Sequence, residues 1–152
     1  MDIDKLKKFE KLPPDVKRQL ALYMSKWNDK KKQSTIKQDF MAFVKHVWPD
    51  FIEGSHHKQV AKKFNDIANG KTKRVIINMA PRHTKSEFAS YLLPAWMVGR
   101  NPKLKIIQST NTTELSVRFG RKAKALMDTP EYKEIFETRL KEDSQAAGKW
   151  ET

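Results

Sequence analysis

The 152-residue chain contains no cysteine, which excludes disulfide bonds, cysteine catalysis and cysteine-ligated zinc or iron–sulfur sites. It also lacks an apolar run of the ~20 residues that a membrane-spanning helix needs. Its first residues show no secretory signal pattern, and we find no internal repeat or low-complexity tract. These absences fit a chain that is the length of one domain and works in a reducing compartment.

Acidic residues are few relative to basic ones. Asp and Glu total 18 against 31 Lys and Arg, so the net charge is +13. Such a charge favours polyanionic partners, nucleic acid first. A basic protein that is merely soluble or ribosome-associated is the alternative.

The first third of the chain has helical periodicity. Apolar residues recur at helical spacing over residues 15–27, 40–48 and 55–69. The polar, cationic stretch 28–34 is interpreted as a linker, and contact with phosphate is the alternative. The sequence predicts a helical segment over residues 1–54, followed by a second domain over residues 55–152.

The pattern then changes to short runs rich in β-branched residues. Segments 74–79 and 103–109 are predicted to be buried strands, and a helix is predicted after each. This alternation predicts an α/β fold with a partial parallel sheet, preceded by the N-terminal helical segment.

Lys85 and Ser86 begin the helix that follows the first predicted strand and its loop. Backbone N–H groups, the helix N-terminus and a lysine together form a phosphate-binding loop, and the hydroxyl can bind Mg²⁺. Met79 and Thr84 stand where the pattern Gly-x-x-x-x-Gly-Lys-Ser/Thr has glycine, so the motif is a weak match. The alternative is a surface loop with a capping serine.

Segment 76–87 resembles the deviant Walker A segment of the large subunits of tailed-phage terminases, which are ATP-driven DNA-packaging motors. Other stretches that resemble family segments are residues 56–59, 108–111, 118–121, 130–136 and 146–150. The similarity covers residues 40–152. It implies a P-loop NTPase-like fold and an ATPase in the cytoplasm of the infected host cell. The implied partners are double-stranded DNA, the remainder of the large subunit, the small terminase subunit and the portal.

The resemblance also implies roles for particular residues. Lys85 binds the β- and γ-phosphates of ATP, Arg82 meets the γ-phosphate, and Ser86 holds Mg²⁺. The remaining members of the implied nucleotide site are Pro81, His83 and Thr84 in the loop, with His57 and Gln59 bordering the adenine. The alternatives are a salt bridge from Arg82 to Glu87 or to a neighbouring subunit, an exposed His83 with no function, and a helix-surface position for Gln59.

A second set of residues suggests contact with DNA. The basic side chains on the predicted helix after residue 111 are Arg118, Arg121, Lys122 and Lys124, which could face DNA phosphates or only solvent. Thr110 and Asn111 could sense the nucleotide or move with DNA, although Asn111 could equally be a plain helix cap.

Members of the family continue to an apolar strand that ends in adjacent acids, the Walker B element, and then to a nuclease domain. This chain contains neither. We therefore expect the N-terminal piece of a terminase ATPase domain, which pairs with a complementary fragment or self-associates. The alternative function is a non-enzymatic basic module that binds DNA or another subunit.

Overall fold

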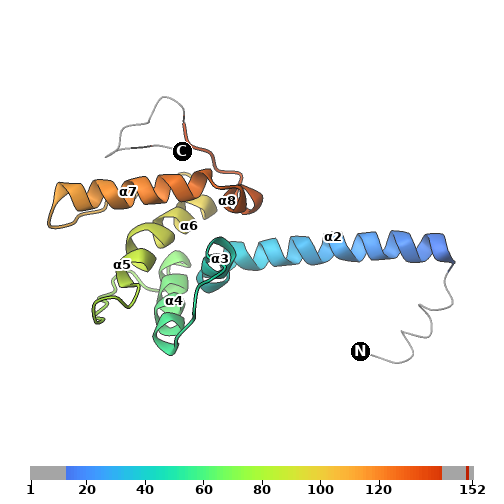
Figure 1. The fold of residues 1–152 in the computed structure, drawn as a ribbon, viewed down its shortest axis with the longest axis horizontal. Helices are drawn as coiled ribbons and strands as arrows, with labels where there is room; N and C mark the ends of the chain where they lie inside the picture. The colour runs from blue at the N-terminus through green and yellow to red at the C-terminus, as the bar shows by residue number, and fades with distance from the viewer. Residues whose placement is uncertain (1–12, 142–149, 151–152) are drawn as a thin grey trace. The chain divides into compact units, whose positions relative to one another are not determined.

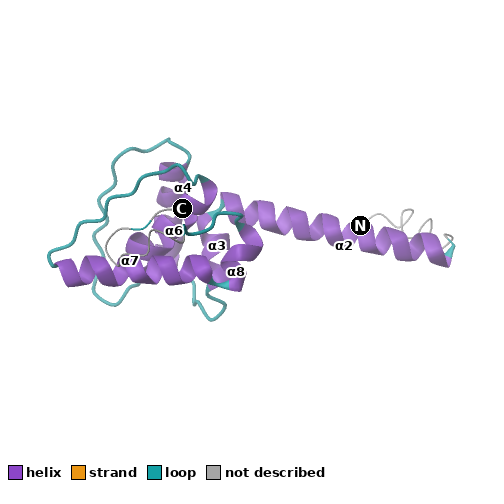
Figure 2. Cartoon of the chain, turned by 90° about the horizontal axis from the view of Figure 1, so that it is seen from above, coloured by secondary structure: helices purple, strands orange, loops and turns teal. Residues whose placement is uncertain are grey.

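The computed structural model describes residues 13–141 and 150, and every regular element within them is a helix (Figures 1 and 2). The chain divides into two compact units, Met1–Ser34 and Thr35–Thr152. The elements are α2 (Pro14–Gln38), α3 (Phe40–Val47), α4 (Ser55–Ala68), α5 (Lys85–Glu87), the π-helix η1 (Phe88–Leu92), α6 (Leu93–Arg100), α7 (Thr113–Asp128) and α8 (Pro130–Ile135). The boundary between the units falls within α2, so the last residues of this helix and all the elements after it belong to the second unit.

Helix α2 confirms the helix predicted over residues 15–27, but it does not stop there. The linker predicted at residues 28–34 is wrong, because α2 continues through this stretch to Gln38. The stretch contains neither glycine nor proline, and its lysines and glutamine are good helix formers. In the first unit the side chains of Tyr23 and Trp27 are exposed.

The core of the second unit is built around Phe40 of α3, which is fully buried. Its ring meets Phe64 of α4, Phe88 of η1 and Trp96 of α6 edge-on, with centroids 5.1, 5.4 and 5.5 Å away. Burial of each such side chain stabilises the fold by about 1.5–3 kcal/mol. The indole N–H of Trp96 is satisfied by the carbonyl of Ile36, at 3.1 Å. Four helical elements therefore share one aromatic centre.

A side-chain network at Asp39 fixes α3 against α4. One carboxylate oxygen of Asp39 accepts the N–H of Ala42 and so caps α3, and the other accepts the amide N–H of Asn65. The amide oxygen of Asn65 in turn accepts the N–H of Phe40 at 2.8 Å. Asp39 is thus the N-cap of the helix predicted from the periodicity of residues 40–48.

The predicted α/β fold with a P-loop NTPase-like partial parallel sheet is wrong. Within the described residues, segments 74–79 and 103–109 are extended but form no strand, and Figure 2 draws them as loops. Ile77 packs against the helical core, whereas Ile76 and Ile107 are 90% and 96% exposed. An extended segment becomes a strand only when a neighbour pairs with its N–H and C=O groups. The described part of the chain supplies no such neighbour.

None of the described helices is both long enough and apolar enough to cross a membrane. The segment 146–150, which resembles a family landmark, lies outside the described residues except for Trp150. This side chain packs against the core of the second unit.

Candidate functional site

The loop between segment 74–79 and α5 has an unusual backbone. Arg82 and Thr84 have φ values of 64° and 56°, in the left-handed region that favours glycine. The Nδ1–H of His83 donates to the carbonyl of Pro81 at 2.8 Å. The side chains of Pro81, Arg82 and His83 are exposed. The loop is therefore a tight turn that presents these side chains to solvent.

Lys85 spans this loop from end to end. Its ammonium donates to the carbonyl of Met79, with Nζ 3.2 Å from the oxygen. Met79 and Thr84 are the two residues that replace the glycines of the regular pattern. Thr84 nevertheless has the left-handed backbone (φ 56°, ψ 8°) for which glycine is ordinarily used. The local geometry at Thr84 thus removes one objection to a phosphate-binding loop.

A helix N-terminus faces the same loop. Elements α5, η1 and α6 follow one another without a break from Lys85 to Arg100, and the N–H of Phe88 donates to the carbonyl of Thr84 at 2.9 Å. The N–H groups of Lys85, Ser86 and Glu87 precede this helical hydrogen bond. Such groups, with the positive end of the helix dipole, attract anions. The exposed hydroxyl of Ser86 lies beside them in the sequence.

His57 of α4 contacts the loop directly. Its Nε2 is 2.6 Å from the hydroxyl oxygen of Thr84, and its Nδ1 accepts the N–H of Gly54 at 2.9 Å. Its ring is buried beside Phe51 and Phe88. Burial, and then the neighbouring His56, lower the pKa of His57 below its usual value of 6.5. The structure thus places His57 in direct contact with the loop, whereas Gln59 is exposed on α4.

Glu87 is held by Lys122 of α7. Both carboxylate oxygens of Glu87 lie 2.9 Å from the ammonium of Lys122, which also sits 5.4 Å from the ring centroid of Tyr91. Burial, and then Glu87, raise the pKa of the Tyr91 hydroxyl. The expected alternative for Arg82, a salt bridge to Glu87, is replaced by this pair.

The four basic residues predicted to bind DNA are not equivalent. Lys122 is engaged with Glu87, and Lys124 is only partly exposed. Arg118 and Arg121 are exposed on α7. The two arginines are the members of the set best placed to meet a phosphate backbone.

Residues before α7 serve local structure. The hydroxyls of Thr110 and Ser116 are 2.7 Å apart, and α7 is capped by Thr112, whose hydroxyl accepts the N–H of Leu115. The cap expected at Asn111 is therefore one residue away. Asn111 itself is exposed.

The ligands of a bound Mg²⁺ ion would have to come from the loop and from the nucleotide. The described residues hold no group of three or more His, Cys, Asp or Glu side chains that could bind a metal ion. The exposed hydroxyl of Ser86 is a suitable single ligand for Mg²⁺ that arrives with phosphate oxygens. The chemistry of the loop therefore fits a metal–nucleotide complex.

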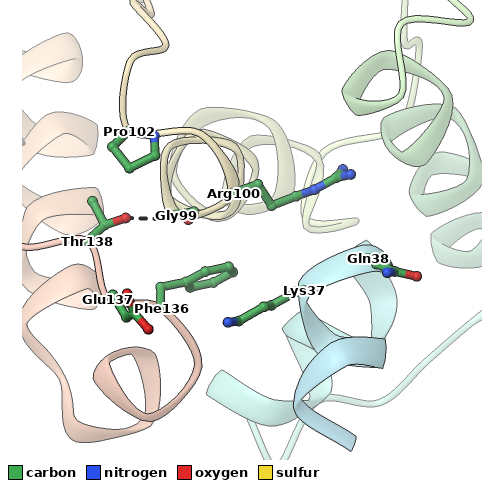
Figure 3. Close-up of a pocket in the computed structure, with 8 residues that line it drawn as sticks. All are labelled: Lys37, Gln38, Gly99, Arg100, Pro102, Phe136, Glu137 and Thr138. Carbon is green, nitrogen blue, oxygen red and sulfur yellow. Dashed lines mark hydrogen bonds between the residues drawn. The ribbon is translucent and has the colours of Figure 1, made fainter. Parts of the chain in front are cut away.

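A separate pocket of the second unit lies between the end of α2, the end of α6 and the segment after α8 (Figure 3). Lys37 points toward Phe136 and Glu137, whereas the guanidinium of Arg100 points away from them. Thr138 donates to the carbonyl of Gly99 at 3.4 Å. None of the predicted site residues lines this pocket.

Comparison of the chain with protein-family models, curated proteins and solved structures finds no match.

Proposed function

We propose that the loop from Pro81 to Ser86 binds the phosphates of Mg·ATP, and that the chain is the ATP-binding portion of a viral DNA-packaging terminase motor. One observation carries the nucleotide part of this proposal. The left-handed backbone of Thr84 directly precedes Lys85 at a helix N-terminus, and Lys85 reaches back across the loop to Met79. The proposal depends on this local geometry and not on a sheet.

Three side chains of the loop have defined roles in the proposed site. Lys85 exchanges the carbonyl of Met79 for β- and γ-phosphate oxygens, which compensate its charge better than a neutral carbonyl. Arg82, exposed on the loop, binds the γ-phosphate with its planar guanidinium. The backbone N–H groups of Lys85 and Ser86 bind the same anion, and the hydroxyl of Ser86 binds Mg²⁺.

The motor function rests on the resemblance and on charge. Hydrolysis needs a carboxylate that orients the attacking water, and the resemblance assigns it to the remainder of the large subunit. Arg118 and Arg121 on α7 are exposed, and the chain has a net charge of +13, both of which suit contact with DNA phosphates. The ion pair between Glu87 and Lys122 joins α5 to this same helix.

The proposal is tested by the thermal stability of the chain with Mg·ATP. A ligand at about 100 times its Kd stabilises a protein by about 2.7 kcal/mol, which corresponds to a rise in Tm of about 5–10 °C for a chain of this size. We expect Lys85→Ala to abolish the rise. The control Lys63→Ala, which removes an exposed lysine of α4, should retain it.

The alternative function, a basic module that never binds nucleotide, predicts a different result. If the chain attracted Mg·ATP through its net charge alone, Lys63→Ala and Lys85→Ala would reduce the rise in Tm by about the same amount. An equal loss in the two variants, or no rise in the wild type, would contradict the proposed function.

A further inference from the structure

The backbone of Thr84 needs support from another residue. A β-branched residue with a positive φ is a conformational outlier, whereas glycine adopts the same backbone without steric cost. Thr84 has φ 56° and ψ 8° at the position where the regular phosphate-loop pattern has glycine. An interaction of the Thr84 side chain must therefore favour this conformation over the extended one.

The hydrogen bond from His57 supplies that support. Because Nδ1 of His57 accepts the N–H of Gly54, the neutral ring carries its proton on Nε2 and donates it to the hydroxyl of Thr84. The ring has little freedom to turn, since it is buried with centroids 4.8 Å from that of Phe51 and 5.3 Å from that of Phe88. The donor is thus held in place before any ligand arrives.

Two other threonines show what the hydroxyl would otherwise do. Thr112 and Thr129 precede α7 and α8 with extended backbones, and their hydroxyls accept N–H groups of the first helical turn. Thr84 precedes α5 with a left-handed backbone, and its side chain makes no capping hydrogen bond. In both cases the donor lies three residues after the threonine. The bond to His57 therefore leaves the corresponding N–H of Glu87, next to those of Lys85 and Ser86, to an anion.

We propose that His57 is a positioning residue for the phosphate-binding loop, which holds Thr84 in the backbone conformation that presents Lys85 and Ser86 to the ligand. This proposal rests on the proposed function. In this proposal the hydrogen bond between His57 and Thr84 stabilises the left-handed backbone that glycine adopts at this position in the regular pattern. His57 itself makes no contact with the nucleotide.

The test is a double-mutant cycle on the full chain. We expect His57→Ala to weaken binding of Mg·ATP by roughly tenfold, the order typical of outer-shell partners. In the Thr84→Gly background, whatever its own affinity, adding His57→Ala should change the Kd by less than about twofold. His57→Gln, which retains an N–H donor, should lose less affinity than His57→Ala. An equal loss in both backgrounds would overturn the proposal, because His57 would then act on the ligand or on the fold as a whole.

A second readout does not need the nucleotide. In ligand-free NMR spectra, His57→Ala should move the amide signals of Lys85 and Ser86, and it should leave them in place in the Thr84→Gly background. The control His46→Ala removes a histidine whose Nε2 bonds to the carbonyl of Glu131, and it should move neither signal. If the wild type binds no Mg·ATP, the proposed function fails, and these signals alone decide the role of His57. Movement in both backgrounds, or in neither, counts against it.

Discussion

At the scale of single residues, His57 shows how position in the fold changes a role. The resemblance implied that it borders the adenine, in the segment one helix before the loop. The structure buries it beside Phe51 and Phe88, with both ring nitrogens engaged by Gly54 and Thr84. A residue 27 positions from its partner gives no periodic signal that sequence reasoning could have used.

The buried ring also predicts how stability depends on pH. The pKa of His57 is lowered from 6.5 in the folded chain by burial and by His56 and His83, against an opposing effect of Glu53. As the pH falls through 6.5, His57 therefore takes up a proton in the unfolded chain before it does so in the folded chain. Its contribution to the free energy of unfolding is thus complete above pH 6.5. It is lost as the pH falls further toward the folded pKa.

Urea unfolding at about pH 7.5 and about pH 5.5 measures this effect. We expect the wild type to lose more stability than His57→Gln between the two conditions, because glutamine does not titrate. Equal losses in the two proteins would mean that other groups account for the pH dependence.

At the scale of elements, helices matched their sequence patterns better than extended segments did. The helix predicted over residues 55–69 agrees with α4 to within one residue, because its apolar residues have the helical period. In the structure Gly70 follows the end of this helix with φ +72°. Helix α2 was cut short in the prediction, since a run of charge was taken for a loop. A helix carries its own hydrogen bonds, whereas segments 74–79 and 103–109 depend on a neighbour.

Helix α7 carries the prediction for DNA. Binding of duplex DNA should weaken with salt, since each phosphate contact releases counterions. We expect the double variant Arg118→Ala/Arg121→Ala to weaken binding and to reduce the slope of log K against log salt by about 2.

The matched control is Lys62→Ala/Lys63→Ala, which removes the same charge from exposed positions on α4. Fluorescence anisotropy with a labelled duplex over a salt series distinguishes the two pairs. If both double variants lower the slope equally, the DNA contact is a property of net charge and not of α7.

At the scale of the whole molecule, exposed apolar side chains and a high net charge have opposite effects on association between molecules. The second unit buries one aromatic cluster, but extended segments leave Ile76 and Ile107 almost fully exposed. Exposed apolar side chains on extended backbone favour association between molecules. A net charge of +13 opposes association until salt screens it.

We therefore expect light scattering of the isolated chain to increase between about 50 mM and about 500 mM salt, as the Debye length falls. Ile76→Ser/Ile107→Ser should reduce the increase without loss of helix content, because neither side chain belongs to the core. A monomer at every salt concentration would show that the extended segments do not cause self-association.

The sequence by itself determined the net charge, the main helices and the position of the loop before Lys85, because these follow from composition and short-range periodicity. Only the tertiary structure decided that Thr84 bonds to His57, that Lys122 bonds to Glu87 and that segments 74–79 and 103–109 form no strand. Each of these outcomes depends on groups distant in the chain being brought within hydrogen-bonding distance or failing to meet. Short-range patterns contain no information about such encounters.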